Sequence, residues 1–366
     1  MASQPGPLTK AGTVVVPLLA LVVLGLTWGR DLPGWLVALV AVLLAGAVLC
    51  AVHHAEVVAH KVGEPFGSLV LAVAVTVIEV ALIVTLMADG GDKSASLARD
   101  TVFAAVMITC NGIVGLALLV GAWRGGVAPF STEGTVAAVA TVATLATLSL
   151  VLPTFTTSKP GPEFTGAQLA FAAVVSLAVY GLFVAMQTVR HREFFLPVTR
   201  DGEVLDEDDH AHPPSTRETF LSLGLLLVAL VAVVGDTKTI SPVIEDGVAA
   251  AGLPQAFVGV VIALMVLLPE TLAAYHSARR DRTQISLNLA HGSAIASIGL
   301  TIPAIAVASI WMDGRLLLGL GATHMVMLAL TVVVSVLTVI TGRATLLQGG
   351  LHLTLFASFV FLAISP

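Results

Sequence analysis

Long apolar stretches constrain this chain more than any other feature of its sequence. A helix needs about 20 mostly apolar residues to cross the hydrocarbon core of a bilayer. Windows of that length predict eleven transmembrane helices, of which the seventh is short and the ninth and tenth are long enough to tilt or break. The predicted spans are 11–28, 33–52, 66–88, 101–122, 134–153, 166–187, 219–235, 255–276, 284–311, 315–341 and 350–365.

The composition supports the same class of protein. Hydrophobic residues make up 57% of the 366 positions and charged residues only 11%, whereas a soluble domain carries about 25% charged residues. The net charge of −6 is local, because seven of the 23 acids lie between Glu193 and Asp209. We therefore expect an all-α polytopic membrane protein with the bilayer as its partner, and not a nucleic-acid binder, which needs a basic surface.

The distribution of Lys and Arg predicts the orientation. With the N-terminus in the cytoplasm, eleven basic residues fall on the inner side and six on the outer side. Positive charges accumulate in cytoplasmic loops. The sequence thus favours a cytoplasmic N-terminus and an external C-terminus.

A polar segment divides the spans into two groups. Residues 189–218 form this segment, six predicted spans precede it and five follow. With residues 1–31 set aside as an extra N-terminal helix, residues 32–188 and 219–366 each hold five spans. An odd number of spans per half places the two halves in opposite orientations, as in transporters built from inverted repeats.

An alignment of the two halves supports this plan. Residues 66–79 and 257–270 align without a gap, with identical Phe, Val, Ala, Val and Glu at five positions. Matched apolar residues carry little weight in such helices. The match of Glu79 with Glu270 carries more, because each lies inside an apolar run with no Lys or Arg within a helical turn, whereas the other 21 acids are assigned to loops or helix ends.

Glu79 and Glu270 predict a cation and proton site. A charge at mid-bilayer costs about 2.5–3.5 kcal/mol, which is normally tolerated where the group faces a cavity and has a function. Two such carboxylates hold protons, or they hold a cation whose charge favours their ionised forms. Mutually exclusive binding of this kind is what cation/proton antiport requires. Calcium would need further oxygens, since it takes 6–8 ligands. The alternative is a purely structural role, in which the two glutamates are protonated and hydrogen-bond neighbouring helices.

The residues around the pair supply candidates for supporting groups. Pro269 precedes Glu270, kinks its helix and frees a carbonyl. The following helices offer further candidates, which are Thr109, Asn111 and Gly112 in the first half and Asn288, His291, Gly292, Ser293 and Ser297 in the second. Each of these also has a structural interpretation, since Ser often mediates helix packing and a hydrogen-bonded core histidine is more common than a proton relay.

The polar segment carries a run of acids. Two interpretations stay open, a solvated linker and a low-affinity cytoplasmic cation sensor, and the spacing does not fit an EF-hand. The acids concerned are Asp201, Glu203, Asp206, Glu207, Asp208 and Asp209.

Several of these motifs resemble one known family. They are the run from His53 to Ser68, the helix ending at Glu79, Leu268-Pro-Glu270, Asn288-Leu-Ala-His-Gly-Ser293 and Thr301-Ile-Pro303. Together they resemble the bacterial calcium(sodium, potassium)/proton antiporters of the calcium/cation antiporter superfamily.

This resemblance implies two inverted five-helix repeats plus an extra first helix, in the bacterial inner membrane. It implies cation binding between Glu79 and Glu270 and export of Ca²⁺, with Na⁺ or K⁺ as further substrates, driven by inward flow of H⁺ and without a cofactor. One departure is that the Gly-Asn-Ala-x-Glu pattern of calcium/proton exchangers is absent at both glutamates. The departure leaves open a Na⁺(K⁺)/H⁺ antiporter with little Ca²⁺ activity.

Two other classes of function compete with antiport. A proton-independent cation channel could use the same carboxylates, and proton coupling distinguishes it from an antiporter. An intramembrane enzyme is disfavoured, because the spans carry no His-Glu-x-x-His motif, no paired aspartates and no convincing Ser–His or Cys–His pair.

Overall fold

Helices account for almost all of the regular structure. The computed structural model describes residues 7–30, 32–63, 66–88, 95–198, 214–254, 256–311 and 314–365. The first half of the chain holds α1 (Pro7–Thr27), α2 (Gly34–Val62), α3 (Phe66–Ala88), α4 (Leu97–Met107), η2 (Ile108–Ile113), α5 (Val114–Gly125), α6 (Thr132–Ala146), η3 (Thr147–Val151), α7 (Leu152–Phe155), α8 (Gly166–Ala185), η4 (Met186–Arg190) and η5 (Arg192–Phe195). The second half holds α9 (Thr216–Ala250), α10 (Ala256–Arg279), α11 (Thr283–Ala308), α12 (Ala322–Val339) and α13 (Leu346–Ile364).

Within the described residues, eight continuous helices are long and apolar enough to cross a membrane. A ninth is α10, which is bent by 48° between Phe257–Leu268 and Glu270–Arg279. This bend confirms the kink predicted from Pro269. Two shorter apolar stretches, Ala11–Thr27 and Thr76–Thr85, belong to α1 and α3. A multispan membrane protein is therefore confirmed, and the count of eleven spans stays a prediction.

Two predicted span lengths were wrong. The seventh span was expected to be short, over 219–235, but α9 is the longest helix, with 35 residues. The hydropathy window ended at the polar residues Asp236 and Lys238, whereas the helix continues past both. The tenth span was expected to be long, over 315–341, but α12 has 18 residues and begins at Ala322.

Local capping signals explain several helix starts. Ser215 and Glu218 form a reciprocal capping box at the start of α9, with the Glu218 amide donating to Ser215 Oγ at 3.2 Å. Thr165 with Gln168 and Thr345 with Gln348 do the same for α8 and α13. Each box satisfies backbone donors that a helix N-terminus leaves unpaired.

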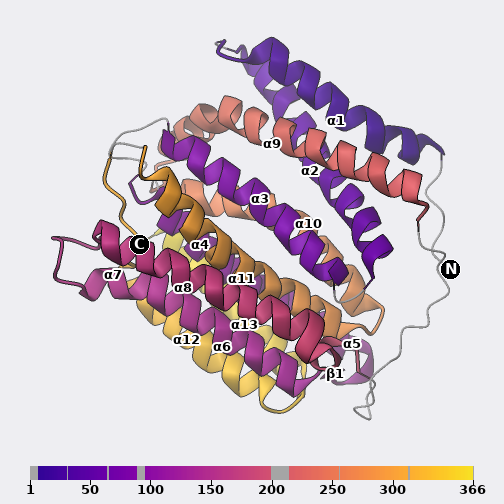
Figure 1. The fold of residues 1–366 in the computed structure, drawn as a ribbon, viewed down its shortest axis with the longest axis vertical. Coiled ribbons are helices and arrows are strands. Elements are labelled where there is room, and N and C mark those ends of the chain that lie inside the picture. The colour runs from indigo at the N-terminus through magenta and orange to yellow at the C-terminus, as the bar shows by residue number, and fades with distance from the viewer. Residues whose placement is uncertain are drawn as a thin grey trace.

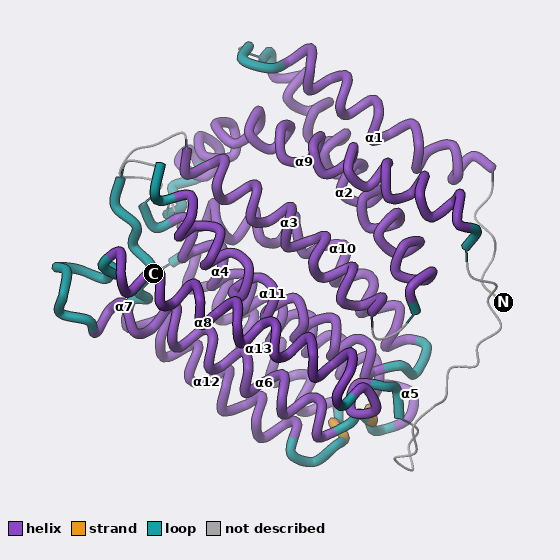
Figure 2. The backbone as a smooth tube through the Cα atoms, viewed as in Figure 1, coloured by secondary structure: helices purple, strands orange, loops and turns teal. Residues whose placement is uncertain are grey.

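The two halves of the chain pack against each other throughout. α2 packs on α9, α3 on α11, α4 on α10 and α5 on α13. α9 lies beside α1 and α2 at one side of the molecule, away from α6 and α12 (Figure 1). Loops lie at the ends of the helices, where a short antiparallel pair joins β1 (Ala128–Pro129) to β2 (Arg343–Ala344) (Figure 2).

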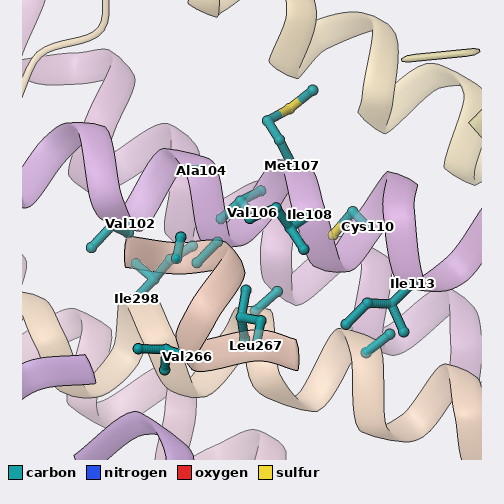
Figure 3. Close-up of a cluster of buried hydrophobic side chains, with 14 of the residues drawn as sticks. Val102, Ala104, Val106, Met107, Ile108, Cys110, Ile113, Val266, Leu267 and Ile298 are labelled. Carbon is teal, nitrogen blue, oxygen red and sulfur yellow. The ribbon is translucent and has the colours of Figure 1, made fainter. Parts of the chain in front are cut away.

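The centre of the bundle is apolar and formed by both halves. Val106 and Ile108 of α4 and η2 belong to the same buried cluster as Leu267 of α10 and Ile298 of α11 (Figure 3). α11 is largely buried, as is the segment formed by α4, η2 and α5. The candidate site lies against α11.

Candidate cation and proton site

Glu79 lies inside the bundle on α3. Its side chain is buried, and its carboxylate Oε1 accepts a hydrogen bond of 2.7 Å from Ser297 Oγ. Ser297 lies on α11, 218 residues further along the chain. The contact between α3 and α11 therefore joins the first half of the chain to the second at this carboxylate.

Glu270 lies on α10, directly after the bend in that helix. Its side chain is fully buried, and its Oε2 accepts a hydrogen bond of 2.6 Å from Ser293 Oγ of α11. Its other oxygen, Oε1, has no hydrogen-bond partner among the described residues. A buried carboxylate oxygen without a partner is costly, so this atom is the natural point for a proton or a cation to bind.

The two carboxylates share one face of α11. Ser293 and Ser297 are four residues apart, which places their hydroxyls about one turn, or roughly 6 Å, apart along the helix. Through these two serines, both carboxyl groups are held against the same stretch of α11. Neither forms an ion pair with a described residue. The arrangement is thus a pair of buried acids with hydroxyl donors and no compensating basic group.

This arrangement suits either protons or a cation. Without a bound cation, two neighbouring buried carboxylates avoid the cost of charge by holding protons. A cation between them stabilises both ionised forms. Among the described residues no group of three or more His, Cys, Asp or Glu side chains is placed to hold a metal ion, so further cation ligands would be hydroxyls, carbonyls and water.

Thr301 extends the polar stripe of α11 by one more turn. Ser293, Ser297 and Thr301 repeat every four residues and therefore lie along one face of the helix. The hydroxyl of Thr301 is fully buried and has no partner among the described residues. The sequence analysis named Thr301 only as part of the family resemblance. Its four-residue spacing from Ser297 could have indicated that it lies on the same helix face as the serines.

The hydrogen bonds of Asn111 within the described part of the chain do not go to either glutamate. Its amide nitrogen donates to Thr331 Oγ1 at 2.9 Å, and its carbonyl oxygen lies 3.3 Å from His352 Nδ1. The other ring nitrogen of His352 lies 3.2 Å from Thr338 Oγ1. Asn111 thus belongs to a separate buried polar cluster between η2, α12 and α13.

Asn288 and His291 are also bonded elsewhere. The Asn288 side chain donates to the Phe195 carbonyl at 2.6 Å and accepts from Gln284 at 2.8 Å. The His291 ring bonds the Leu287 carbonyl of its own helix at 3.0 Å. Of the supporting residues proposed from the sequence, the two serines are the ones hydrogen-bonded to the glutamates.

Two predicted features have no side-chain placement. The side chain of Pro269 and the acids from Asp201 to Asp209 lie outside the described residues. The bend of α10 at residue 269 is described, but the acidic run has no structural description.

Comparison with known proteins identifies the family. A model of the sodium/calcium exchanger protein family matches residues 32–189 and 221–365, which together make up most of the chain. The chain belongs to this family. Its members are secondary transporters and not enzymes. The antiporter class, ion transport and transmembrane helices expected from the sequence are confirmed.

Individual relatives cover nearly the whole exchanger. A protein of Sinorhizobium fredii (strain NGR234) named "Putative ionic transporter y4hA" is 45% identical over 96% of this chain and 95% of its own. The sodium-potassium/proton antiporter ChaA of Escherichia coli K12 is 34% identical with the same two coverages. A Ca²⁺/H⁺ antiporter of Aphanothece halophytica is 24% identical over 82% of each chain.

The fold is shared with solved structures. A crystal structure of the H⁺/Ca²⁺ exchanger CAX matches with a TM-score of 0.69 and 15% identity, over 97% of this chain and 88% of that one. The native structure of YfkE matches with the same TM-score at 14% identity, over 97% and 99%. At these identities the likeness establishes the fold alone.

Proposed function

We propose that this exchanger exports a cytoplasmic cation in exchange for protons at the pair Glu79 and Glu270. The observation that carries the proposal is the geometry of the two carboxylates: both are buried, both accept from serines one turn apart on α11, and neither has a basic partner among the described residues. Such a pair binds H⁺ or a cation but is poor at holding both. Alternating exposure of the pair to the two sides of the membrane then couples the two fluxes.

Na⁺ and K⁺ are the main cations in this proposal. The 34% identity to the Escherichia coli sodium-potassium/proton antiporter supports them. The sequence supports them as well, since the Gly-Asn-Ala-x-Glu pattern of calcium/proton exchangers is absent at both glutamates. Ca²⁺, which the sequence put first, is the second candidate and is supported by the relative from Aphanothece halophytica.

The proposal includes the arrangement predicted from the sequence. The protein spans the bacterial inner membrane eleven times, with its N-terminus in the cytoplasm, as an extra first helix followed by two inverted repeats of five. The division of the family match into 32–189 and 221–365 supports repeats at 32–188 and 219–366. The acids from Asp201 to Asp209 then lie on the cytoplasmic side, where they tune activity and do not carry it.

Exchange in everted membrane vesicles tests the function. Na⁺, K⁺ and Ca²⁺ are compared side by side under the same proton gradient, with and without an uncoupler. We expect uptake of Na⁺ and K⁺ that collapses with the uncoupler, and weaker uptake of Ca²⁺. Uptake that ignores the proton gradient would contradict antiport and favour a channel. Uptake of Ca²⁺ alone would contradict the cation preference.

A further inference from the structure

A third carboxylate, Asp236, lies inside the bundle. From the sequence it was assigned to a helix end, but it lies within the 35-residue α9 with 14 helical residues after it. Its side chain has 0% exposure, and neither carboxylate oxygen has a hydrogen-bond partner among the described residues. The glutamate pair retains a serine donor at each carboxylate, whereas Asp236 has none.

The surroundings of Asp236 are apolar and closely packed. α9 packs on α2, α1 and α3. The buried residues one turn away on the same helix are Ala232, Val233 and Ile240. α1 approaches so closely that a Cβ on Gly235 would lie 2.3 Å from Leu24 Cδ2. With 0% exposure the carboxylate is closed off from water in this packing, although the cavity lined by Leu24, Gly235 and Lys238 comes within one residue of it.

The titratable groups on the helices packed against α9 either have hydrogen-bond partners other than Asp236 or lie at other positions along their helices. Glu79 of α3 is hydrogen-bonded to Ser297 of α11, and Glu270 of α10 to Ser293. On α9 itself, Lys238 lies two residues on and lines a cavity with Ile78 and Ala81 of α3. The titratable side chains of α2 all lie in its second half, at Cys50, His53, His54, Glu56, His60 and Lys61. The described side chains of α1 include none.

The polar groups nearest along α9 do not form a cation site. Thr237 and Thr239 donate their hydroxyls to the carbonyls of Val233 and Gly235 on the preceding turn. Ser241 donates to Glu245. A metal cation needs several oxygen ligands, whereas a proton needs one carboxylate oxygen. The geometry therefore favours a proton as the occupant.

We propose that Asp236 is a proton-binding site of this exchanger, separate from the pair Glu79 and Glu270, and that it takes H⁺ and not a metal cation. In the described packing the carboxyl is neutral. Release breaks its O–H bond, leaves the electron pair on the carboxylate and passes the proton to water, so it requires α9 to separate from α2 or α1 and admit water. Proton occupancy of Asp236 is thereby tied to the packing of α9. This proposal deepens the proposed function, and of its two tests only the transport measurement rests on that function.

Infrared spectroscopy of the full-length protein in detergent tests the proton site without transport. The spectrum of Asp236→Asn is subtracted from that of the unmodified protein at neutral pH. We expect the difference to contain the carbonyl stretch of one protonated carboxyl, with a downward shift in D₂O. A difference that contains the bands of an ionised carboxylate would overturn the proposal. Ser241→Ala, another buried position on α9, is the control and should lack the band.

Transport measurements test the coupling. Cation exchange is measured in proteoliposomes while the pH on both sides is raised together at a constant gradient. Asn mimics the protonated carboxyl, so Asp236→Asn should lose the part of the pH dependence that the Ser241→Ala control retains. A pH profile identical to that of the control would overturn the coupling.

Size-exclusion elution checks that Asp236→Asn is folded. If it is not, Asp236→Glu replaces it in the infrared measurement. The expected result is then a shifted band of a protonated carboxyl, and the band of an ionised carboxylate would contradict the proposal. Absence of all exchange in the unmodified protein would refute the proposed function, while the infrared result would still stand.

Discussion

Two central segments carry polar side chains into the bundle, and the described hydrogen bonds to the glutamates come from just one of them. α11 supplies both serine donors, Ser297 to Glu79 and Ser293 to Glu270. The segment formed by α4, η2 and α5 supplies Asn111, which bonds Thr331 and His352 instead. From the sequence, both segments were expected to supply supporting groups.

The local helix geometry accounts for the difference. The serines of α11 are four residues apart in regular helix, so they stay on one face. Asn111 lies in the π-helical turn η2, and such a turn inserts a residue and rotates the next part of the helix relative to regular α-helical geometry. An asparagine also has donors and an acceptor that must be satisfied when buried, and η2 brings it to partners on α12 and α13. A polar residue at a matching place along a helix therefore need not face the same site.

The largest expected effect is that of Glu79→Gln and Glu270→Gln. Each substitution removes a carboxylate that holds the cation, and losing one partner of a buried charge interaction costs about 3–5 kcal/mol. We expect exchange in vesicles to fall by at least about 100-fold, with the protein still folded and inserted. Full activity in either variant would refute the assigned site.

Ser293→Ala and Ser297→Ala test the role of α11. A hydrogen bond to a charged group contributes about 1.5–3 kcal/mol, so each substitution should weaken cation affinity by roughly ten- to a hundredfold. Ser149→Ala is a matched control, because Ser149 is also buried but bonds Ser176. If the control and the two variants bound the cation equally well, α11 would have no special role.

Asn111→Ala tests the other side of the comparison. The change removes the hydrogen bonds that Asn111 makes with Thr331 Oγ1 and His352 Nδ1, which should cost about 1–3 kcal/mol of stability. Because the described hydrogen bonds of Asn111 go to other residues and not to the glutamates, we expect cation affinity to be unchanged. Thermal unfolding and cation binding measured on the same sample separate the two effects, and a large loss of affinity with normal stability would break the comparison.

The smallest expected effect is that of Glu163→Gln, outside the spanning helices. Burial alone would raise the pKa of Glu163, but hydrogen bonds and ion pairs with Lys159 and Arg315 outweigh it and hold the pKa below its ordinary value. A lowered pKa in the folded state contributes stability at neutral pH that is lost as the pH falls through that lowered value. Glu163→Gln should cost about 1 kcal/mol or less at neutral pH and remove this acid-dependent part, as followed by thermal unfolding against pH. Exchange should be unchanged. An exchange defect as large as that of Glu79→Gln would show that loss of exchange is not specific to the glutamate pair.

Hydropathy was sufficient to predict most helices, because a spanning helix must be apolar along its length. It failed at α9, where Asp236 and Lys238 are only two residues apart and resemble the end of a span. The same error concealed Asp236 as a buried acid. A window that tolerates one buried acid would have continued through it.

The depth of Glu79 and Glu270 was predictable because few acids lie within apolar runs. The choice of Ser293 and Ser297 over Asn111, Asn288 and His291 was not, since it depends on the rotation of each helix against its neighbours. That rotation is set by packing, as where α11 meets both α3 and α10, and by the π-helical turn at Asn111. Neither is encoded in a short motif.

Proton release on cation binding tests the central claim most directly. The purified protein is placed in weakly buffered detergent solution near neutral pH, and Na⁺, K⁺ or Ca²⁺ is added while the pH is recorded. We predict that a transported cation releases protons from the unmodified protein, and that the release disappears in the double variant Glu79→Gln/Glu270→Gln. Cation binding without proton release, or an equal release from the double variant, would contradict competition between cation and proton at this pair.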